Sequence, residues 1–244
     1  MAKIFITGST DGLGLLAAKE LLKQGHEVFL HARNQERKEE VMKNNPAFKK
    51  VFVADFADVQ QIIALANEVN QVGKFDVIIH NAGVYTASGE AIFTVNVLAP
   101  YILSCLLEKP QRLIYVSSDM HLGGHSKIDN IKNNLNSITY SDSKLQVLML
   151  CKALARAWPG AYANALHPGW VPTKMGGKGA PDDLQKGFET QVWLAVSNDN
   201  EALVNGKYFF HKKQSRYHID ADNIILQNKL IALCEEITGV GFNN

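Results

Sequence analysis

The sequence lacks an excess of charge and is poor in cysteine. Its 25 Lys and Arg residues against 24 Asp and Glu residues leave a formal net charge of +1. No segment is basic enough to indicate a nucleic-acid-binding surface, so we expect no nucleic-acid partner. The three cysteines, Cys105, Cys151 and Cys234, each lie in an apolar, helix-like stretch. This odd count argues against a disulfide framework and indicates reduced, buried thiols in a cytoplasmic protein.

Three further absences narrow the class of protein. We find no apolar run that approaches the length of a membrane span, so we expect no membrane partner. The first strand-like run begins at residue 3, so we expect no leader peptide. His121 and His125 are separated by two glycines, with no cysteine pair or acidic cluster nearby, so we expect no bound metal.

Apolar runs of strand length alternate with longer amphipathic stretches along the whole chain. The expected strands cover 3–7, 27–32, 50–55, a segment within 75–83, 112–118, a segment within 161–170, and 206–211. The expected helices cover 14–25, 34–45, 58–73, 90–107, 139–158, a stretch containing 188–197, and 221–239, whereas 119–137 is expected to be a loop. This alternation predicts an α/β fold: a doubly wound parallel sheet (Rossmann fold) of about seven strands, with helices on both faces. We expect one domain spanning 1–244.

A glycine-rich turn directly follows the first expected strand. In "TGSTDGLG" (7–14), Gly8, Gly12 and Gly14 surround Ser9, Thr10 and Leu13. A pyrophosphate needs close backbone approach and free N–H groups at a helix N-terminus, both of which side chains would obstruct. A plain glycine turn is the alternative, but the position between a strand and a helix favours a dinucleotide site, to which the Ser9 and Thr10 hydroxyls add donors.

Further motifs occupy the ends of the later strands, in the order found in the short-chain dehydrogenase/reductase family. They are "VADFAD" (53–58), "NAG" (81–83), "VNV" (95–97), "YVSS" (115–118) and "HPGWVPT" (167–173). The chain thus resembles that family over nearly its whole length. The interval between Ser118 and Tyr140 and the C-terminal part resemble its retinol-dehydrogenase-like and WW-domain-containing-oxidoreductase-like branch. The resemblance implies cofactor contacts from Asp55, Phe56, Asn81, Ala82, Gly83, Pro168, Gly169, Val171 and Thr173.

The end of the second strand distinguishes between the two nicotinamide cofactors. NAD-binding folds place a carboxylate there, whereas NADP-binding folds offer a cation to the 2′-phosphate. Here "FLHARN" supplies Arg33 and Asn34 and no acid. We therefore expect NADP(H), with NAD(H) possible, because Asp11 lies in the glycine turn where some NADP-using relatives carry a basic residue.

The sequence contains two tyrosine–lysine pairs with the spacing Y-x-x-x-K. Tyr140 and Lys144 fall at the start of an expected helix, where residues i and i+4 share a face. Tyr208 and Lys212 begin on an expected strand, where four residues span about 13 Å, so they should not act as a unit. A nearby ammonium lowers the pKa of a phenol, so we expect Lys144, together with an oxidised nicotinamide, to activate Tyr140.

Ser117 and Ser118 point to opposite faces in an extended strand, so only one should reach the site. The family resemblance implies Ser118, which would orient the substrate oxygen, and Asn96, which would hold a water in a proton relay. The predicted function is an NAD(P)(H)-dependent oxidoreductase that acts on a carbonyl or alcohol, with Tyr140 as general acid/base. A protein that senses NADPH without catalysis stays open as an alternative.

The substrate is expected to be an apolar aldehyde or ketone. A Gly/Pro-rich segment, 171–188, is expected to be a substrate lid. His121, Trp170 and Met175, together with Ser118, are the expected substrate contacts, although each of the first three could equally serve packing. The family resemblance also implies a homodimer or homotetramer.

Overall fold

The computed structural model describes residues 1–242, except for the side chains of residues 130, 132 and 133. Its centre is an eight-stranded sheet in the order β3-β2-β1-β4-β5-β6-β7-β8. The strands are β1 Lys3–Ile6, β2 Glu27–Ala32, β3 Val51–Val53, β4 Val77–His80, β5 Arg112–Val116, β6 Tyr162–His167, β7 Tyr208–Phe210 and β8 Lys213–Gln214. The first seven pair in parallel, which confirms the predicted doubly wound fold.

The eighth strand was not predicted. The two-residue strand β8 returns antiparallel to β7 through a turn in which His211 and Lys212 have φ of 46° and 64°. Non-glycine residues adopt this left-handed conformation uncommonly, and neither residue belongs to the turn formers that signal a hairpin in a sequence.

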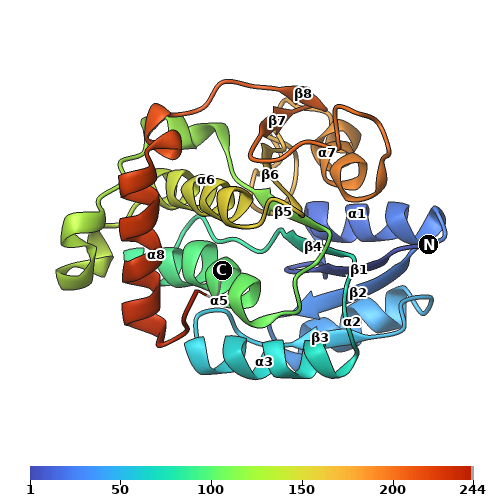
Figure 1. The fold of residues 1–244 in the computed structure, drawn as a ribbon. Coiled ribbons are helices and arrows are strands. Elements are labelled where there is room, and N and C mark those ends of the chain that lie inside the picture. Colours follow the sequence, from blue (N-terminus) through green and yellow to red (C-terminus); the bar gives the residue numbers. More distant parts are fainter. Residues whose placement is uncertain (243–244) are drawn as a thin grey trace.

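Helices cover both faces of the sheet (Figure 1). They are α1 Gly12–Lys23, α2 Gln35–Asn44, α3 Val59–Gln71, α4 Gly89–Phe93, α5 Ala99–Leu106, α6 Tyr140–Ala157, α7 Leu184–Val196 and α8 Ile224–Thr238. Because side chains alternate along each strand, the sheet has two cores. In β1, Phe5 packs with the side that carries α3, α5, α6 and α8, whereas Ile4 and Ile6 pack with α1, α2 and α7.

Among the residues that the structure describes, one helix meets the length and composition of a membrane span, so our expectation from the sequence was wrong on this point. The stretch Gly89–Leu106 combines α4, the π-helical turn η1 (Thr94–Leu98) and α5, and it has a mean hydropathy of 1.4. It is 78% buried inside the protein, as expected for a core helix. The polar residues Glu90, Asn96 and Ser104 interrupt the apolar run, so the sequence did not indicate a stretch of this length.

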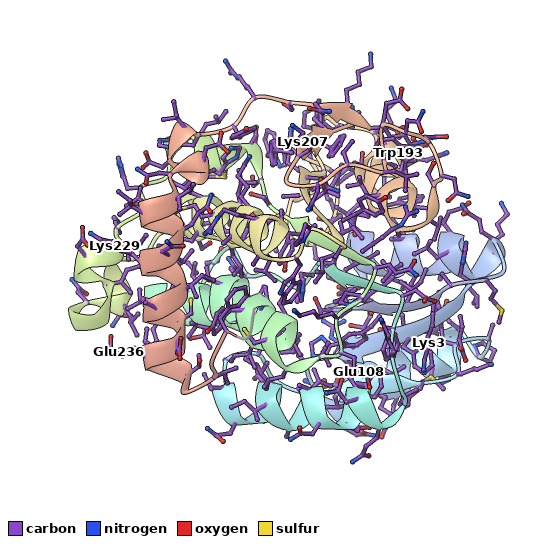
Figure 2. All side chains as sticks on the ribbon, in the orientation of Figure 1. Lys3, Glu108, Trp193, Lys207, Lys229 and Glu236 are labelled. Atoms are coloured by element: carbon purple, nitrogen blue, oxygen red, sulfur yellow. The ribbon has the colours of Figure 1, made fainter. Side chains whose placement is uncertain are left out.

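The segment 119–137 is not the plain loop that we expected. It forms three short 3₁₀ turns, η2 Asp119–Gly123, η3 Ile128–Asn133 and η4 Leu135–Ser137. Lys229 of α8, labelled in Figure 2, reaches Asp129 of η3 with an Nζ–Oδ1 distance of 2.7 Å. The expected lid range also needs correction, because α7 begins at Leu184 and the loop itself ends at residue 183.

Candidate functional site

The glycine turn between β1 and α1 has the geometry of a cradle for a pyrophosphate. Gly8 has φ of 60°, and a Cβ there would lie 2.7 Å from the Ala82 Cα. Gly12 has φ of 54°, and a Cβ there would meet only Thr173, at 3.9 Å. The positive φ favours glycine at both positions, and Gly12 leaves open space at the N-terminus of α1.

The N-terminus of α1 also lacks a side-chain cap. Its N-cap residue Asp11 makes no capping hydrogen bond, and the first turn contains no acidic residue. By contrast, side chains cap α2, α3, α6, α7 and α8. The unpaired N–H groups at the start of a helix attract an anion. The residues present therefore fit the pyrophosphate of a dinucleotide.

A cleft of about 680 Å³ extends from this turn along the carboxyl ends of the strands. The predicted site residues that line it are Gly8, Thr10, Gly12, Leu13, Gly14, Arg33, Asn34, Asp55, Phe56, Asn81, Ala82, Gly83, Tyr140, Lys144, Pro168, Thr173 and Met175. The predicted residues outside its lining are Ser9, Asn96, Ser118, His121, Gly169, Trp170 and Val171.

Ser9 does not offer its hydroxyl to the cleft. The side chain is fully buried, donates to the Ile6 carbonyl at 2.8 Å and accepts from the His31 N–H at 3.0 Å. We therefore correct its expected role from cofactor contact to support of the turn. Asn81 has a similar function, because its Nδ2 donates to the carbonyls of Thr7 and Gly8 at 3.0 and 2.8 Å.

His31, which the sequence analysis did not single out, also supports the turn. Its Nδ1 accepts from the Gly8 N–H at 2.9 Å, and its Nε2 lies 2.9 Å from the Ala54 carbonyl. The proton therefore belongs on Nε2. Burial lowers the pKa of His31 to about 4, so the ring stays neutral and keeps accepting from Gly8. In the sequence, His31 is recognisable as a polar residue inside an otherwise apolar strand.

Cationic side chains surround the end of the cleft beside β2. Arg33 and Asn34 line it as predicted, and Asn34 also caps α2 by accepting from the Arg37 N–H at 3.0 Å. Arg37 and Lys174 were not predicted. They lie 3.4 and 3.0 Å from Asp11 Oδ2. The acid in the glycine turn is thus paired with two cations, which reduces its repulsion of a phosphate.

The second end of the cleft contains Tyr140, the first residue of α6. A capping box sets this first turn: Thr139 Oγ1 accepts from the Asp142 N–H, and Asp142 accepts from the Thr139 N–H at 2.9 Å. Asp142 also accepts from the His125 N–H at 2.7 Å and lies 2.8 Å from Lys127 Nζ. The position of Tyr140 therefore depends on a buried carboxylate that joins α6 to the preceding segment.

Replacing Asp142 by alanine is expected to destabilise the fold by about 3 kcal/mol, because three donors lose a charged partner. The exposed N-cap Asp183 of α7 provides a matched control, for which alanine should cost about 1 kcal/mol. Urea denaturation measures both losses.

The stabilisation by Asp142 should also depend on pH. Burial would raise its pKa, but Lys127, Thr139 and His125 together hold it below the ordinary value of 3.8. The contribution should therefore be present above pH 3.8 and disappear as the pH falls further. Equal losses for the Asp142 and Asp183 variants would contradict this role.

Lys144 lies one turn after Tyr140 on the same face of α6. Its side chain is 4% exposed, its Nζ donates to the Val116 carbonyl at 2.8 Å and lies 5.3 Å from the centre of the Tyr140 ring. Burial lowers the pKa of Lys144 to about 8. A Cβ at Gly83 would lie 3.4 Å from both Lys144 Nζ and Asn96 Oδ1, so the three residues converge.

Asn96 lies in the π-helical turn η1, a type of distortion that is frequent at functional sites. Its Oδ1 accepts from the Val84 N–H at 2.8 Å, and its Nδ2 donates to the Val84 carbonyl and to Ser143 Oγ, both at 3.0 Å. Asn96 therefore fixes the backbone that follows "NAG". The water relay that the family resemblance implies stays a prediction.

Ser117 and Ser118 diverge as strand alternation requires. Ser117 is buried, and its Oγ donates to the Lys144 carbonyl at 2.8 Å. Ser118 is partly exposed and its hydroxyl interacts with Tyr140. Its Oγ also lies 3.2 Å from Asp119 Oδ1. The structure thus brings Ser118 to the tyrosine, whereas Ser117 is the serine that lines the cleft.

Without a bound cofactor, the environment of Tyr140 raises the pKa of its phenol. Burial raises the pKa of Tyr140 to about 12, the Ser118 hydroxyl opposes this, and the charges of Asp119 and Tyr85 add to it. The contribution of an oxidised nicotinamide to the pKa stays a prediction.

The expected substrate contacts separate into two groups. Met175 lines the cleft and is 52% exposed, and Trp170 is 60% exposed beside it, with its Nε1 donating to the Gly176 carbonyl at 2.8 Å. His121 is fully buried and cannot touch a substrate, so that expectation was wrong.

Two of the expected cofactor contacts, Gly169 and Val171, lie in the loop after β6. A Cβ at Gly169, where φ is 85°, would collide with Asp182, and Val171 is buried.

The second tyrosine–lysine pair is separated as predicted. Tyr208 is buried in β7, whereas Lys212 lies in the turn to β8 with its Nζ 3.4 Å from Glu189. Trp193, labelled on α7 in Figure 2, packs against Phe209 with a centroid distance of 5.5 Å, as expected for a core position.

Comparison with known proteins agrees with this geometry. A family model described as short chain dehydrogenase matches residues 2–120. The chain is 42% identical to an uncharacterized oxidoreductase of Emericella nidulans, covering 99% of this chain and 98% of the relative. It is 43% identical to the short-chain dehydrogenase chyC of Penicillium rubens, covering 98% of each. Retinol dehydrogenase 13 of Homo sapiens is 29% identical over 97% of this chain and 84% of its own length.

Solved structures show the same fold. An uncharacterized protein of Mycobacterium paratuberculosis superimposes with a TM-score of 0.82 at 23% identity, covering 100% of this chain and 96% of that one. A blue fluorescent protein from a metagenomic library, in complex with NADPH, has a TM-score of 0.70 at 20% identity, with 85% and 95% coverage. Fold and site define the class of Rossmann-fold oxidoreductases. Within that class, the chain belongs to the short-chain dehydrogenase/reductase family.

Proposed function

We propose that the protein transfers a hydride between NADP(H) and a carbonyl or alcohol substrate, with Tyr140 as the general acid/base. One observation carries this proposal. Tyr140 and Lys144 line one end of the cleft, and the uncapped glycine turn with Arg33 and Arg37 lines the rest. A single cleft thus combines groups for proton transfer with groups for a phosphorylated dinucleotide.

Different residues of the chain would bind different parts of the cofactor. The α1 N-terminus would hold the pyrophosphate, Asp55 would lie at the adenine, and Arg33 and Arg37 would pair with a 2′-phosphate. Lys144 would grip the nicotinamide ribose. When bound, the nicotinamide supplies or accepts the hydride.

Proton transfer is the part of the reaction that the protein itself performs. A Tyr140 with a pKa near 12 is protonated at neutral pH, so it can donate its proton to a carbonyl oxygen that becomes an alkoxide. The Ser118 hydroxyl would hold that oxygen beside the phenol. The Lys144 ammonium stabilises the developing phenolate, which its burial makes more effective because the local dielectric constant is low.

The apolar surroundings of Tyr140 favour an apolar carbonyl substrate. The Tyr85 ring is 47% exposed and packs edge-on against Tyr140, with the centroids 4.8 Å apart. Met175 and Trp170 expose further apolar surface from the loop after β6. We propose neutral aldehydes or ketones with an aromatic or alkyl body as substrates.

A screen of such carbonyl compounds for oxidation of NADPH, measured by the loss of its absorbance, tests the proposed function. Turnover of at least one compound, abolished in a Tyr140→Phe variant, would support catalysis. NADPH binding without turnover of any carbonyl or alcohol would favour the sensing alternative.

Replacing Arg33 and Arg37 together by alanine is expected to weaken NADPH binding by about 100-fold, because two charge-assisted contacts to a phosphate are lost. NADH has no 2′-phosphate, so its dissociation constant should change less than about threefold. Calorimetric titration with both cofactors measures the two constants.

Lys43→Ala provides the matched control. It removes an exposed charge from the C-terminal end of α2, the helix that contains Arg37. An equal loss of NADPH and NADH affinity in the double variant would contradict a phosphate contact by these arginines.

A further inference from the structure

His121 is a buried histidine that the proposed mechanism does not use. Its side chain is fully buried within η2, three residues after Ser118. Its Nδ1 lies 2.5 Å from the Ser118 carbonyl oxygen, and its Nε2 accepts from the His218 N–H at 3.2 Å. The ring therefore connects the backbone of Ser118 to the segment before η5 (Ile219–Asp222).

This connection matters because Ser118 lies beyond the sheet. β5 ends at Val116, and the last backbone bond of this strand to β6 runs from the Ser117 N–H to the Leu166 carbonyl at 2.7 Å. The Ser118 carbonyl instead accepts from the His121 N–H, at 3.2 Å, and from the His121 ring. His121 thus holds the backbone at Ser118, just beyond the last hydrogen bond between β5 and β6.

The contacts also determine the tautomer of His121. A backbone N–H can only donate, so Nε2 must be unprotonated where it accepts from His218. The proton therefore resides on Nδ1, which donates to Ser118. Burial lowers the pKa of His121, so the neutral ring persists at neutral pH. Tyr208 packs edge-on against the ring with a centroid distance of 4.8 Å, and its hydroxyl lies 3.4 Å from Nδ1, farther than the Ser118 carbonyl.

We propose that His121 is a positioning residue that holds Ser118 in register with Tyr140. It does so through the Nδ1–H bond to the Ser118 carbonyl, and it is itself anchored by the C-terminal segment through His218. This inference rests on the proposed function, in which the Ser118 hydroxyl holds the substrate oxygen. A displacement of about 1 Å at such a group can reduce the rate about 100-fold.

Two amide variants separate the two bonds of the ring. His121→Asn keeps a donor at the place of Nδ1 and should retain the bond to Ser118. His121→Gln keeps an acceptor at the place of Nε2 and should retain only the bond from His218. We expect kcat with a carbonyl substrate to fall about tenfold or more in the Gln variant and less than about threefold in the Asn variant. The dissociation constant for NADPH should change less than about twofold in both.

A double-mutant cycle with Ser118→Ala then distinguishes positioning from general loosening. In the Ser118→Ala background, the Gln substitution should cause no further loss of kcat. An equal or reversed ranking of the two amide variants, or losses that add to that of Ser118→Ala, would overturn the positioning role. Full activity of Ser118→Ala alone would contradict the serine's part in the proposed function instead.

A measurement on the unsubstituted protein keeps the proposal testable if a variant does not fold. Long-range ¹⁵N–¹H correlation spectra of the histidines report which ring nitrogen carries the proton. We expect His121 as the Nδ1–H tautomer at pH 7, and an Nε2–H tautomer would exclude the bond to Ser118.

Discussion

Replacing Tyr140 by phenylalanine is expected to lower kcat for carbonyl reduction by about 1,000-fold, within the range that removal of a general acid causes. The substitution removes one hydroxyl from a partly buried side chain and keeps the ring that packs against Tyr85. The dissociation constant for NADPH should stay within about twofold. Stopped-flow or steady-state loss of NADPH absorbance measures the rate, and fluorescence titration measures the binding.

Tyr162→Phe is the matched control for this prediction. Tyr162 begins β6 at the opposite end of the strand from the cleft and is 36% exposed, so its loss should leave kcat within about twofold. A Tyr140→Phe variant with full turnover would exclude Tyr140 as the proton donor. A variant that no longer binds NADPH would show instead that the cofactor cleft had been disturbed.

The raised pKa of Tyr140 gives the two reaction directions different pH dependence. Reduction uses the phenol, which predominates at every pH below about 12 in the protein alone. Oxidation of an alcohol needs the phenolate, whose fraction rises about tenfold for each pH unit below that pKa. Alcohol oxidation should therefore accelerate from pH 7 to about pH 8, where the Lys144 ammonium begins to lose its proton, whereas reduction should not accelerate.

Much of this site could be predicted because its backbone requirements are local. The glycine turn, the arginine after β2 and the helix that begins at Tyr140 each depend on a few consecutive residues whose conformational preferences differ from the average. The order of strands and helices then places these segments at one edge of a parallel sheet. The second tyrosine–lysine pair was set aside on the same ground, since Tyr208 falls on a strand.

The errors about individual site residues concern what a side chain contacts at a distance. Ser9 has a hydroxyl that could donate to a phosphate. That hydroxyl instead donates to the Ile6 carbonyl and accepts from the His31 N–H. His121 follows Ser118, the serine of the proposed mechanism, yet a C-terminal segment buries it. The cation Lys174 meets Asp11 across 163 residues of sequence. No local pattern reports such pairings, because they arise only when the sheet brings loops together.

Arg37 is an intermediate case. It lies in the first turn of α2, the helix that starts just after β2, whereas Arg33 precedes the Asn34 N-cap of that helix, and both side chains line the cleft. A search for cations in the first turn of the helix after β2 would have found Arg37. The pKa of Tyr140, in contrast, depends on burial, which the sequence pattern around residues 139–146 did not reveal.

Replacing Lys144 by methionine is expected to lower kcat for reduction by about 1,000-fold, because the developing phenolate at Tyr140 loses a buried cation. Methionine fills a similar volume, and the Val116 carbonyl loses one donor. Burial holds the pKa of Lys144 at about 8, so the ammonium is lost as the pH rises through 8. In the unsubstituted protein, kcat/KM for NADPH, which reports groups of the free enzyme, should therefore fall above pH 8.

The pH profile distinguishes this role of Lys144 from a structural one. In Lys144→Met, the residual kcat/KM should no longer fall near pH 8. Lys152→Met is the matched control, since Lys152 is the other buried lysine of α6 and pairs with Asp222 at 2.7 Å, far along the helix from Tyr140. That variant should lose stability but keep the fall above pH 8. If the fall persists in Lys144→Met, another group sets it, and the assignment of Lys144 as the charge that stabilises the phenolate is wrong.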